Sequence, residues 1–308
     1  MTTMMMSSKR GTLIVIGGPT GSGKSALAVE LAKHFCAPII STDSRQVYRG
    51  MAIGTAQPTK EEQEAVQHYF IADREVEDSF NCGRYEVEAL ALLDRLFKSN
   101  RYVVAVGGSG LYIQALCSGM DALPEANESL RAELKQRLES EGLSSLADEL
   151  RRLDPKYAEE VDLCNHARVM RALEVCLTTG RPYSEQRSGS VAERPFNIIK
   201  IATDMPRDIL YERINKRVDQ MVENGLIDEV KHLYPKRELN ALQTVGYREF
   251  FDHFDGKCSM EEAIELVKRN SRRYAKRQMT WFSRDKEFVW FAPTDIEAII
   301  EHINRFAI

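Results

Sequence analysis

The stretch GGPTGSGKS, residues 17–25, has the residue types and the spacing that bind phosphate groups. Gly18 and Gly23 bracket the loop, and Lys24 and Ser25 follow directly, which is the order of a P-loop. The glycines let backbone N–H groups point inward, the lysine adds a positive charge, and the serine hydroxyl suits Mg²⁺. We therefore predict diphosphate binding, with Mg²⁺ held at Ser25, by residues Gly18, Pro19, Thr20, Gly21, Ser22, Gly23, Lys24 and Ser25.

Two more polar residues follow apolar runs that predict strands. Residues 38–40 lead to Asp43, and residues 101–106 lead to Ser109. Because parallel strands end at one edge of a sheet, we expect both side chains to lie beside the P-loop. A carboxylate there suits Mg²⁺ or general base catalysis, although a turn or cap aspartate is the commoner structural role. The second run ends in glycines and not in the aspartate with which ordinary P-loop hydrolases hold Mg²⁺, and this disfavours an ATP-driven motor.

Two arginines lie one turn apart on a predicted helix at residues 208–221. Arg213 and Arg217 are on a side of this helix that its apolar residues do not occupy. They either face solvent or bind the diphosphate, because a guanidinium pairs well with two phosphate oxygens.

A long helix predicted at residues 261–282 carries a run of positive charge. Residues 266–284 contain no acidic residue but seven cations, namely Lys268, Arg269, Arg272, Arg273, Lys276, Arg277 and Arg284. A solvated helix face usually mixes both signs, so this run favours contact with a phosphate backbone. Trp281 and Phe282 either belong to the core or stack on bases, and we favour the core.

The elements that position these residues alternate between strand and helix. Near-continuous apolar strands with helical segments between them indicate a parallel sheet covered on both faces. The chain becomes charged and helical at about residue 124, and strand character resumes at residues 196–202. Helical apolar spacing occurs at 24–35, 84–98, 129–139, 143–153 and 167–178, and a last short strand at 288–291 precedes a final helix.

We predict an α/β fold with a P-loop NTPase-like parallel sheet core flanked by helices. The core comprises residues 11–123 and 195–308, including a helical C-terminal region, and an all-helical domain is inserted at 124–194. Residues 1–10 are expected to be disordered.

The composition fits a cytoplasmic globular protein. The chain has 308 residues with 43% hydrophobic and 29% charged, and its six cysteines form no C-x-x-C pair. No apolar run is long enough to predict a membrane span. The net charge of −4 does not exclude nucleic acid, because the cations are concentrated in one segment.

Several motifs together resemble the tRNA dimethylallyltransferase family, in the bacterial form without a C-terminal zinc finger. In the family's order, they are GGPTGSGKS, ISTDSRQVYRGMAIGTAQP at 40–58, VGGSGLYIQAL at 106–116, RALEV at 171–175, LYERINKRVDQM at 210–221, TVGYREF at 244–250 and AKRQMTWF at 275–282. They span nearly the whole chain, and the segment with DSRQVYRG after a P-loop is the most specific.

The resemblance implies transfer of a dimethylallyl group from dimethylallyl diphosphate to N6 of adenosine 37 in tRNA, with Mg²⁺. Asp43 matches the general base, and Ser109 stands where threonine is usual, near the bridging oxygen of the diphosphate. Arg217 and Lys24 match residues that stabilise the leaving group. The positions that match tRNA contacts are Asp43, Ser44, Arg45, Gln46, Ser109, Arg131, Ala167, Arg168, Val169, Met170, Arg171, Gln243, Thr244, Val245, Gly246, Tyr247, Arg248, Lys276 and Arg277. A monomer is expected.

Three other functions share some of these features. A small-molecule P-loop kinase has the loop and the core, but it does not need the basic helix. An adenylate-type isopentenyltransferase uses a free nucleotide, so it does not need that helix either. An RNA-binding ATPase is disfavoured by the glycines that follow residues 101–106.

Overall fold

The computed structural model describes residues 11–121, 123–124, 127–187, 189 and 191–307, so the predicted disordered segment 1–10 lies outside the described residues. The described chain forms two compact units. Unit 1 contains the residues up to Cys117 and those from Glu193 onward, and unit 2 is Ser118–Ala192. The insertion was predicted at 124–194, whereas unit 2 begins at Ser118, the last residue of helix α4 (Gly110–Ser118), and ends at Ala192.

Unit 1 is built on a six-stranded sheet in the order β3-β2-β4-β1-β5-β6. Every pairing is parallel, as the sequence predicts. The strands are β1 (Thr12–Gly17), β2 (Ile39–Ser41), β3 (His68–Tyr69), β4 (Tyr102–Val106), β5 (Asn197–Thr203) and β6 (Val289–Phe291). The carboxyl ends of all six strands therefore meet at one edge, where the P-loop follows β1.

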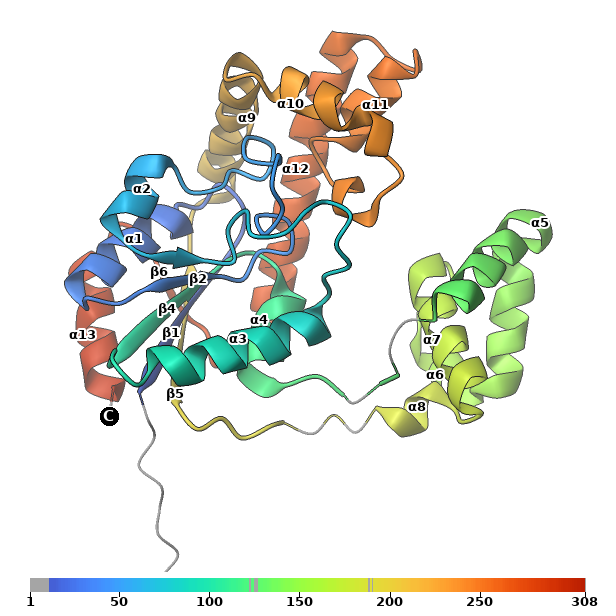
Figure 1. Cartoon of the computed structure of the whole chain (residues 1–308), viewed down its shortest axis with the longest axis horizontal. Helices are drawn as coiled ribbons and strands as arrows, with labels where there is room; N and C mark the ends of the chain where they lie inside the picture. The colour runs from blue at the N-terminus through green and yellow to red at the C-terminus, as the bar shows by residue number, and fades with distance from the viewer. Residues whose placement is uncertain (1–10, 122, 125–126, 188, 190, 308) are drawn as a thin grey trace, which may run out of the picture. The chain divides into compact units, whose positions relative to one another are not determined.

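Helices cover both faces of this sheet (Figure 1). Ile14 and Ile16 of β1 pack with α1 (Lys24–His34) and α13 (Ile296–Phe306). Leu13 and Val15 point to the other face and belong to the core that includes α3 (Cys82–Leu96), α4 and α12 (Met260–Phe282). The alternation along one strand thus accounts for two apolar layers.

Several elements near the site were not predicted. The helix α2 (Lys60–Ala65) has no buried residue, so it shows no apolar periodicity, and a capping box between Thr59 and Glu62 defines its start. Helices α10 (Leu226–Leu233) and α11 (Arg248–Phe254) were not predicted either, whereas α9 (Arg207–Glu223) agrees with the helix predicted at 208–221. These three helices gather with part of α12 at one end of unit 1 (Figure 1). Short 3₁₀ turns at Tyr234–Lys236 and Asn240–Leu242 connect α10 to α11.

Unit 2 is a small helical bundle with its own apolar core. It contains α5 (Glu128–Leu153), α6 (Pro155–Glu160), α7 (His166–Thr179) and α8 (Tyr183–Gln186). Leu134, Leu150 and Leu173 are fully buried in it. Gly142 has φ 80° and ψ 167°, which interrupts α5 between the two helices predicted at 129–139 and 143–153.

No helix in the described part of the chain combines the length and the apolar character needed to cross a bilayer.

Candidate active site

The P-loop follows β1 and is supported by the neighbouring strand β5. The hydroxyls of Ser22 and Thr203 are 2.6 Å apart and hydrogen-bonded, and the Ser22 hydroxyl donates to the Pro19 carbonyl. Gly18 has φ 141°, and a Cβ atom there would lie 2.2 Å from Thr203 Oγ1. Both the backbone conformation and the packing therefore require glycine at this position.

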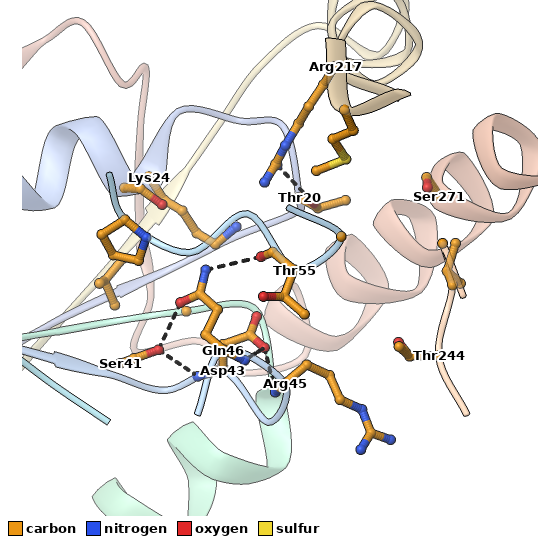
Figure 2. Close-up of a pocket in the computed structure, with 18 of the residues that line it drawn as sticks. Thr20, Lys24, Ser41, Asp43, Arg45, Gln46, Thr55, Arg217, Thr244 and Ser271 are labelled. Carbon is orange, nitrogen blue, oxygen red and sulfur yellow. Dashed lines mark hydrogen bonds between the residues drawn. The ribbon is translucent and has the colours of Figure 1, made fainter. Parts of the chain in front are cut away.

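Two cations extend from different elements toward one cavity (Figure 2). Lys24 Nζ donates to the Pro19 carbonyl over 3.1 Å, and burial together with the nearby Arg217 lowers the pKa of Lys24 to about 8. Arg217 of α9 donates to Thr20 Oγ1 over 3.1 Å, and burial lowers its pKa too. Two positive charges held in a partly desolvated place favour an anionic ligand. Of the two alternatives for these arginines, the structure supports the one that faces the P-loop for Arg217. Arg213 is exposed, but its guanidinium lies beside Gly23 of the same loop.

Asp43 lines the same cavity and also caps a turn. Its Oδ1 accepts from the backbone N–H groups of Arg45 at 2.8 Å and of Gln46 at 3.3 Å. The expected role of a turn aspartate is therefore confirmed, and the same carboxylate lines the cavity, where its role as a general base stays a prediction. The Gln46 amide holds the following loop by donating to the Thr55 and Ala56 carbonyls (Figure 2).

Ser109 follows β4 and contacts the residue next to Asp43. Its Oγ accepts from the Ser44 N–H at 3.0 Å and is 3.3 Å from the Ser44 hydroxyl. Tyr274 of α12 lies near Ser109 and Asp43, and burial raises the pKa of this tyrosine to about 12, with a contribution from Asp43. The two predicted strand-end residues therefore do meet at the sheet edge.

The cavity has an apolar part beside these charges. Ile214, Val218 and Met221 line it from α9, and Leu226 and Val267 line it from α10 and α12. A ligand that combines an anionic group with a short apolar chain matches such a lining.

Ser25 offers a hydroxyl oxygen on the cavity wall, and Asp43 and Glu62 offer carboxylate oxygens there. The described residues contain no group of three or more histidine, cysteine or acidic side chains that could hold a metal. Mg²⁺ is commonly bound by one or two protein oxygens together with substrate phosphates and water, so this donor set fits Mg²⁺ with a diphosphate.

Gln278 of α12 is a buried site residue that sequence reasoning missed. Its Oε1 accepts from the Thr20 N–H at 2.8 Å, and its Nε2 donates to the Gly108 carbonyl at 2.9 Å. The available signal was its position on the buried stripe of α12, which otherwise consists of Ala263, Val267, Ala275 and Phe282.

The segment 243–248 contributes to the cavity through its backbone and smaller side chains. Thr244, Val245 and Gly246 line the cavity, whereas Gln243 and Arg248 are exposed. The prediction that Tyr247 contacts a ligand is wrong for its side chain, which is fully buried.

Tyr247 instead supports the loop that follows Asp43. Its hydroxyl donates to Glu229 of α10, and the Glu229 carboxylate also accepts from the N–H groups of Ile53 and Gly54. Nothing in the sequence was a reason to assign a role to Glu229, because no local pattern distinguishes it from a solvent-exposed glutamate on a helix.

The basic run of α12 is only partly free for a ligand. Lys268 forms ion pairs with Asp219 at 2.8 Å and Glu265 at 3.0 Å, and Arg272 donates to Asn215 of α9. The exposed cations are Arg269, Arg273, Lys276, Arg277 and Arg284.

The two aromatic residues at the end of this helix differ. Phe282 is fully buried, as expected. The preference for a core position of Trp281 is wrong, because this residue is 36% exposed while its indole packs against Gly110.

In unit 2, two of the candidate arginines share one buried carboxylate. Glu174 is 2% exposed and accepts from Arg131 Nε at 2.9 Å and from an Arg171 guanidinium N–H at 2.8 Å. Ala167 and Arg168 are exposed and Met170 is partly buried. Val169 is fully buried in the core of unit 2, so the prediction of a ligand contact is wrong for its side chain.

The chain is similar to known proteins over most of its length. A family model described as IPP transferase matches residues 46–285, more than half of the chain. A tRNA dimethylallyltransferase of Cytophaga hutchinsonii is 50% identical over 292 residues, which are 95% of this chain and 96% of that protein. A tRNA dimethylallyltransferase 2 of Parabacteroides distasonis is 45% identical over 294 residues, covering 96% and 98%.

Solved structures agree with this similarity. The full-length tRNA isopentenylpyrophosphate transferase of Bacillus halodurans is 41% identical with a TM-score of 0.70, and the match covers 96% of this chain and 95% of that one. A eukaryotic dimethylallyltransferase acting on tRNA is 26% identical with a TM-score of 0.76, covering 95% and 78%.

Proposed function

The chain belongs to the IPP transferase family, and from this premise we propose that it transfers a dimethylallyl group from dimethylallyl diphosphate to N6 of adenosine 37 in tRNA. The observation that carries the proposal is a single cavity lined by the P-loop cation Lys24, by Arg217 and by the carboxylate of Asp43. The cations that stabilise the leaving diphosphate and the carboxylate that accepts the proton of the nucleophile can act in one reaction only if they line the same cavity.

The reaction forms a bond between N6 and C1 of the allyl group while the bond from C1 to the diphosphate oxygen breaks. The electron pair leaves with the diphosphate, where Lys24, Arg217 and the P-loop N–H groups stabilise the growing negative charge. The proton of N6 passes to Asp43, and we assign Oδ2 to this step because Oδ1 already caps the turn. Ser109 stands close enough to this turn to help orient the bridging oxygen.

Mg²⁺ is part of the proposal as a partner of the diphosphate. Ser25 would hold it together with phosphate oxygens. When bound, the ion neutralises charge on the leaving diphosphate.

The acceptor is proposed to be a tRNA anticodon stem-loop. Its adenine must leave the base stack to enter the cavity past Thr244 and Gly246. Arg45 and Gln46, the exposed Lys276 and Arg277 of α12, and the arginines of unit 2 are the proposed contacts. Because one chain supplies all of these residues, we propose that it acts as a monomer, in the cytoplasm where tRNA is found.

A labelling experiment separates this function from its rivals. The protein is incubated with Mg²⁺, dimethylallyl diphosphate labelled in the allyl group, and unmodified tRNA carrying adenosine 37. We expect label at that adenosine, and none when guanosine replaces it. Label in AMP would instead indicate a nucleotide prenyltransferase, and hydrolysis or transfer of the γ-phosphate of ATP would indicate a kinase or an ATPase. Either result, without label in tRNA, would refute the proposal.

A further inference from the structure

We propose that Gln278 is a positioning residue that fixes the P-loop against the end of strand β4 and so couples helix α12 to the diphosphate site. The inference rests on the proposed function and adds a residue to it. Gln278 is 5% exposed and belongs to the helix that carries the exposed cations Lys276 and Arg277.

Both atoms of the Gln278 amide have a partner that determines their orientation. Thr20 offers an N–H, which only the amide oxygen can accept, and Gly108 offers a carbonyl, to which only the amide nitrogen can donate. The side chain therefore bridges the P-loop and the β4 end in one defined rotamer.

The two bridged residues lead to opposite sides of the reaction. Thr20 accepts a hydrogen bond from Arg217, on the side of the leaving group. Gly108 precedes Ser109, which bonds to Ser44 next to Asp43, on the side of the base. A shift of Gln278 would therefore disturb both sides together.

Glycines at the ends of β1 and β4 allow helix α12 to come close to the sheet edge. A Cβ atom on Gly108 would lie 2.1 Å from Gln278 Nε2, and one on Gly17 would lie 2.5 Å from the ring of Phe282. The end of β4, which lacks the aspartate of ordinary P-loop hydrolases, thus provides room for the α12 amide.

Substitution by methionine keeps the size and removes both hydrogen bonds. For Gln278→Met we expect dimethylallyl diphosphate to bind about tenfold more weakly and kcat to fall about ten- to a hundredfold, as when buried polar groups lose their partner. The Kd for tRNA should stay within about twofold of wild type, because the phosphate-facing cations remain in place. Gln136 is an exposed glutamine of α5, so Gln136→Met is the matched control. It should change neither the affinity for dimethylallyl diphosphate nor kcat.

The variant Gln278→Glu gives a readout that a merely structural role would not move. As a carboxylate it repels the Gly108 carbonyl, but as a neutral acid it can donate to that carbonyl and still accept from Thr20. Burial raises the pKa of a carboxyl group, so lowering the pH should restore function, and the ratio of the Gln278→Glu rate to the wild-type rate should rise.

The other charged and ionisable groups of the cavity are the same in both proteins, so their effects on the rate cancel in this ratio. They are Lys24, Asp43, Arg45, Glu62, His68 and Arg217, together with Tyr274 on the same helix. The same ratio for Gln278→Met should stay flat with pH.

The experiment measures donor affinity by calorimetry with dimethylallyl diphosphate and Mg²⁺, and transfer rates with saturating tRNA, from about pH 5.5 to 8. Wild-type affinity and rate in Gln278→Met, or a flat ratio for Gln278→Glu, would overturn the inference. A wild-type protein without transfer activity would refute the proposed function, and the affinity comparison would still decide the role of Gln278.

Discussion

Raising the pH should remove the positive charge that Lys24 offers to a diphosphate. Burial and the neighbouring Arg217 lower the pKa of Lys24 to about 8 in the free protein. A bound diphosphate stabilises the ammonium form and raises this pKa again. The affinity for dimethylallyl diphosphate should therefore be constant below this pKa and fall above it.

The size of the effect follows from the protonated fraction of the amine. With a pKa of about 8, roughly nine tenths of Lys24 is protonated at about pH 7 and about 3% at about pH 9.5. The donor should then bind about thirtyfold more weakly at the higher pH, provided that the pKa in the complex lies above this range. The donor diphosphate itself does not change its charge there, because its last ionisation occurs near pH 6.

Calorimetric titration with dimethylallyl diphosphate and Mg²⁺, without tRNA, measures this dependence. Lys24→Arg is the matched control, since a guanidinium stays charged and its affinity should not fall with pH. Lys24→Met should bind weakly at every pH. A wild-type affinity that is constant up to about pH 9.5, or an equal fall in Lys24→Arg, would refute the reasoning.

Unfolding does not account for the expected loss of affinity. The pKa of Lys24 is about 8 in the folded chain and has a model-compound value of 10.5. Between these values the unfolded chain binds more protons, so the contribution of Lys24 to the free energy of unfolding increases as the pH rises. Binding is thus predicted to weaken while this contribution to stability grows.

Three further predictions concern the base and the two proposed tRNA surfaces. Asp43→Asn should lower kcat at least about a hundredfold and leave donor affinity within about twofold, because a general base is lost; a collapse of donor binding at a normal rate would contradict the assignment. Replacing Lys276 and Arg277 by alanine should reduce the slope of log Kd for tRNA against log salt concentration by about two, and an unchanged slope would exclude them as phosphate contacts. Glu174→Ala removes the buried partner of Arg131 and Arg171, so thermal unfolding should show unit 2 destabilised by about 2–4 kcal/mol, and tRNA binding should weaken. An unchanged unfolding transition would show that the two arginines keep their positions without Glu174.

Sequence reasoning found the parts of the site that lie in short contiguous motifs. The P-loop needs only nine neighbouring residues, and its strand and helix follow from local apolar patterns. Asp43 and Ser109 were brought to the same edge by the rule for parallel strands, and the hydrogen bond between Ser109 and Ser44 agrees with that rule.

The parts that could not be predicted depend on contacts between distant segments. Gln278 and Thr20 are 258 residues apart, and nothing in their local sequences relates a glutamine on a basic helix to a P-loop amide. Whether Arg217 or Arg213 faces the cavity depends on the rotation of α9, which the helical spacing alone does not define. Trp281 was misjudged because an aromatic residue beside a buried phenylalanine can pack against a glycine and remain partly exposed.

The strand order also constrains how the protein is made. Strand β1 lies between β4 and β5, and the chain of unit 2 is synthesised after β4 and before β5. Once the residues up to Ala192 have left the ribosome, the growing chain can complete the bundle core of unit 2, while one edge of the buried β1 still lacks its neighbour β5. Such an edge is prone to pair with other chains. Ribosome-stalled chains from which Ala192 but not β5 has emerged should therefore be more protease-sensitive in unit 1 than longer chains from which Thr203 has emerged too. In a cell, the β5 side of strand β1 would then need protection from other chains for as long as unit 2 is being translated.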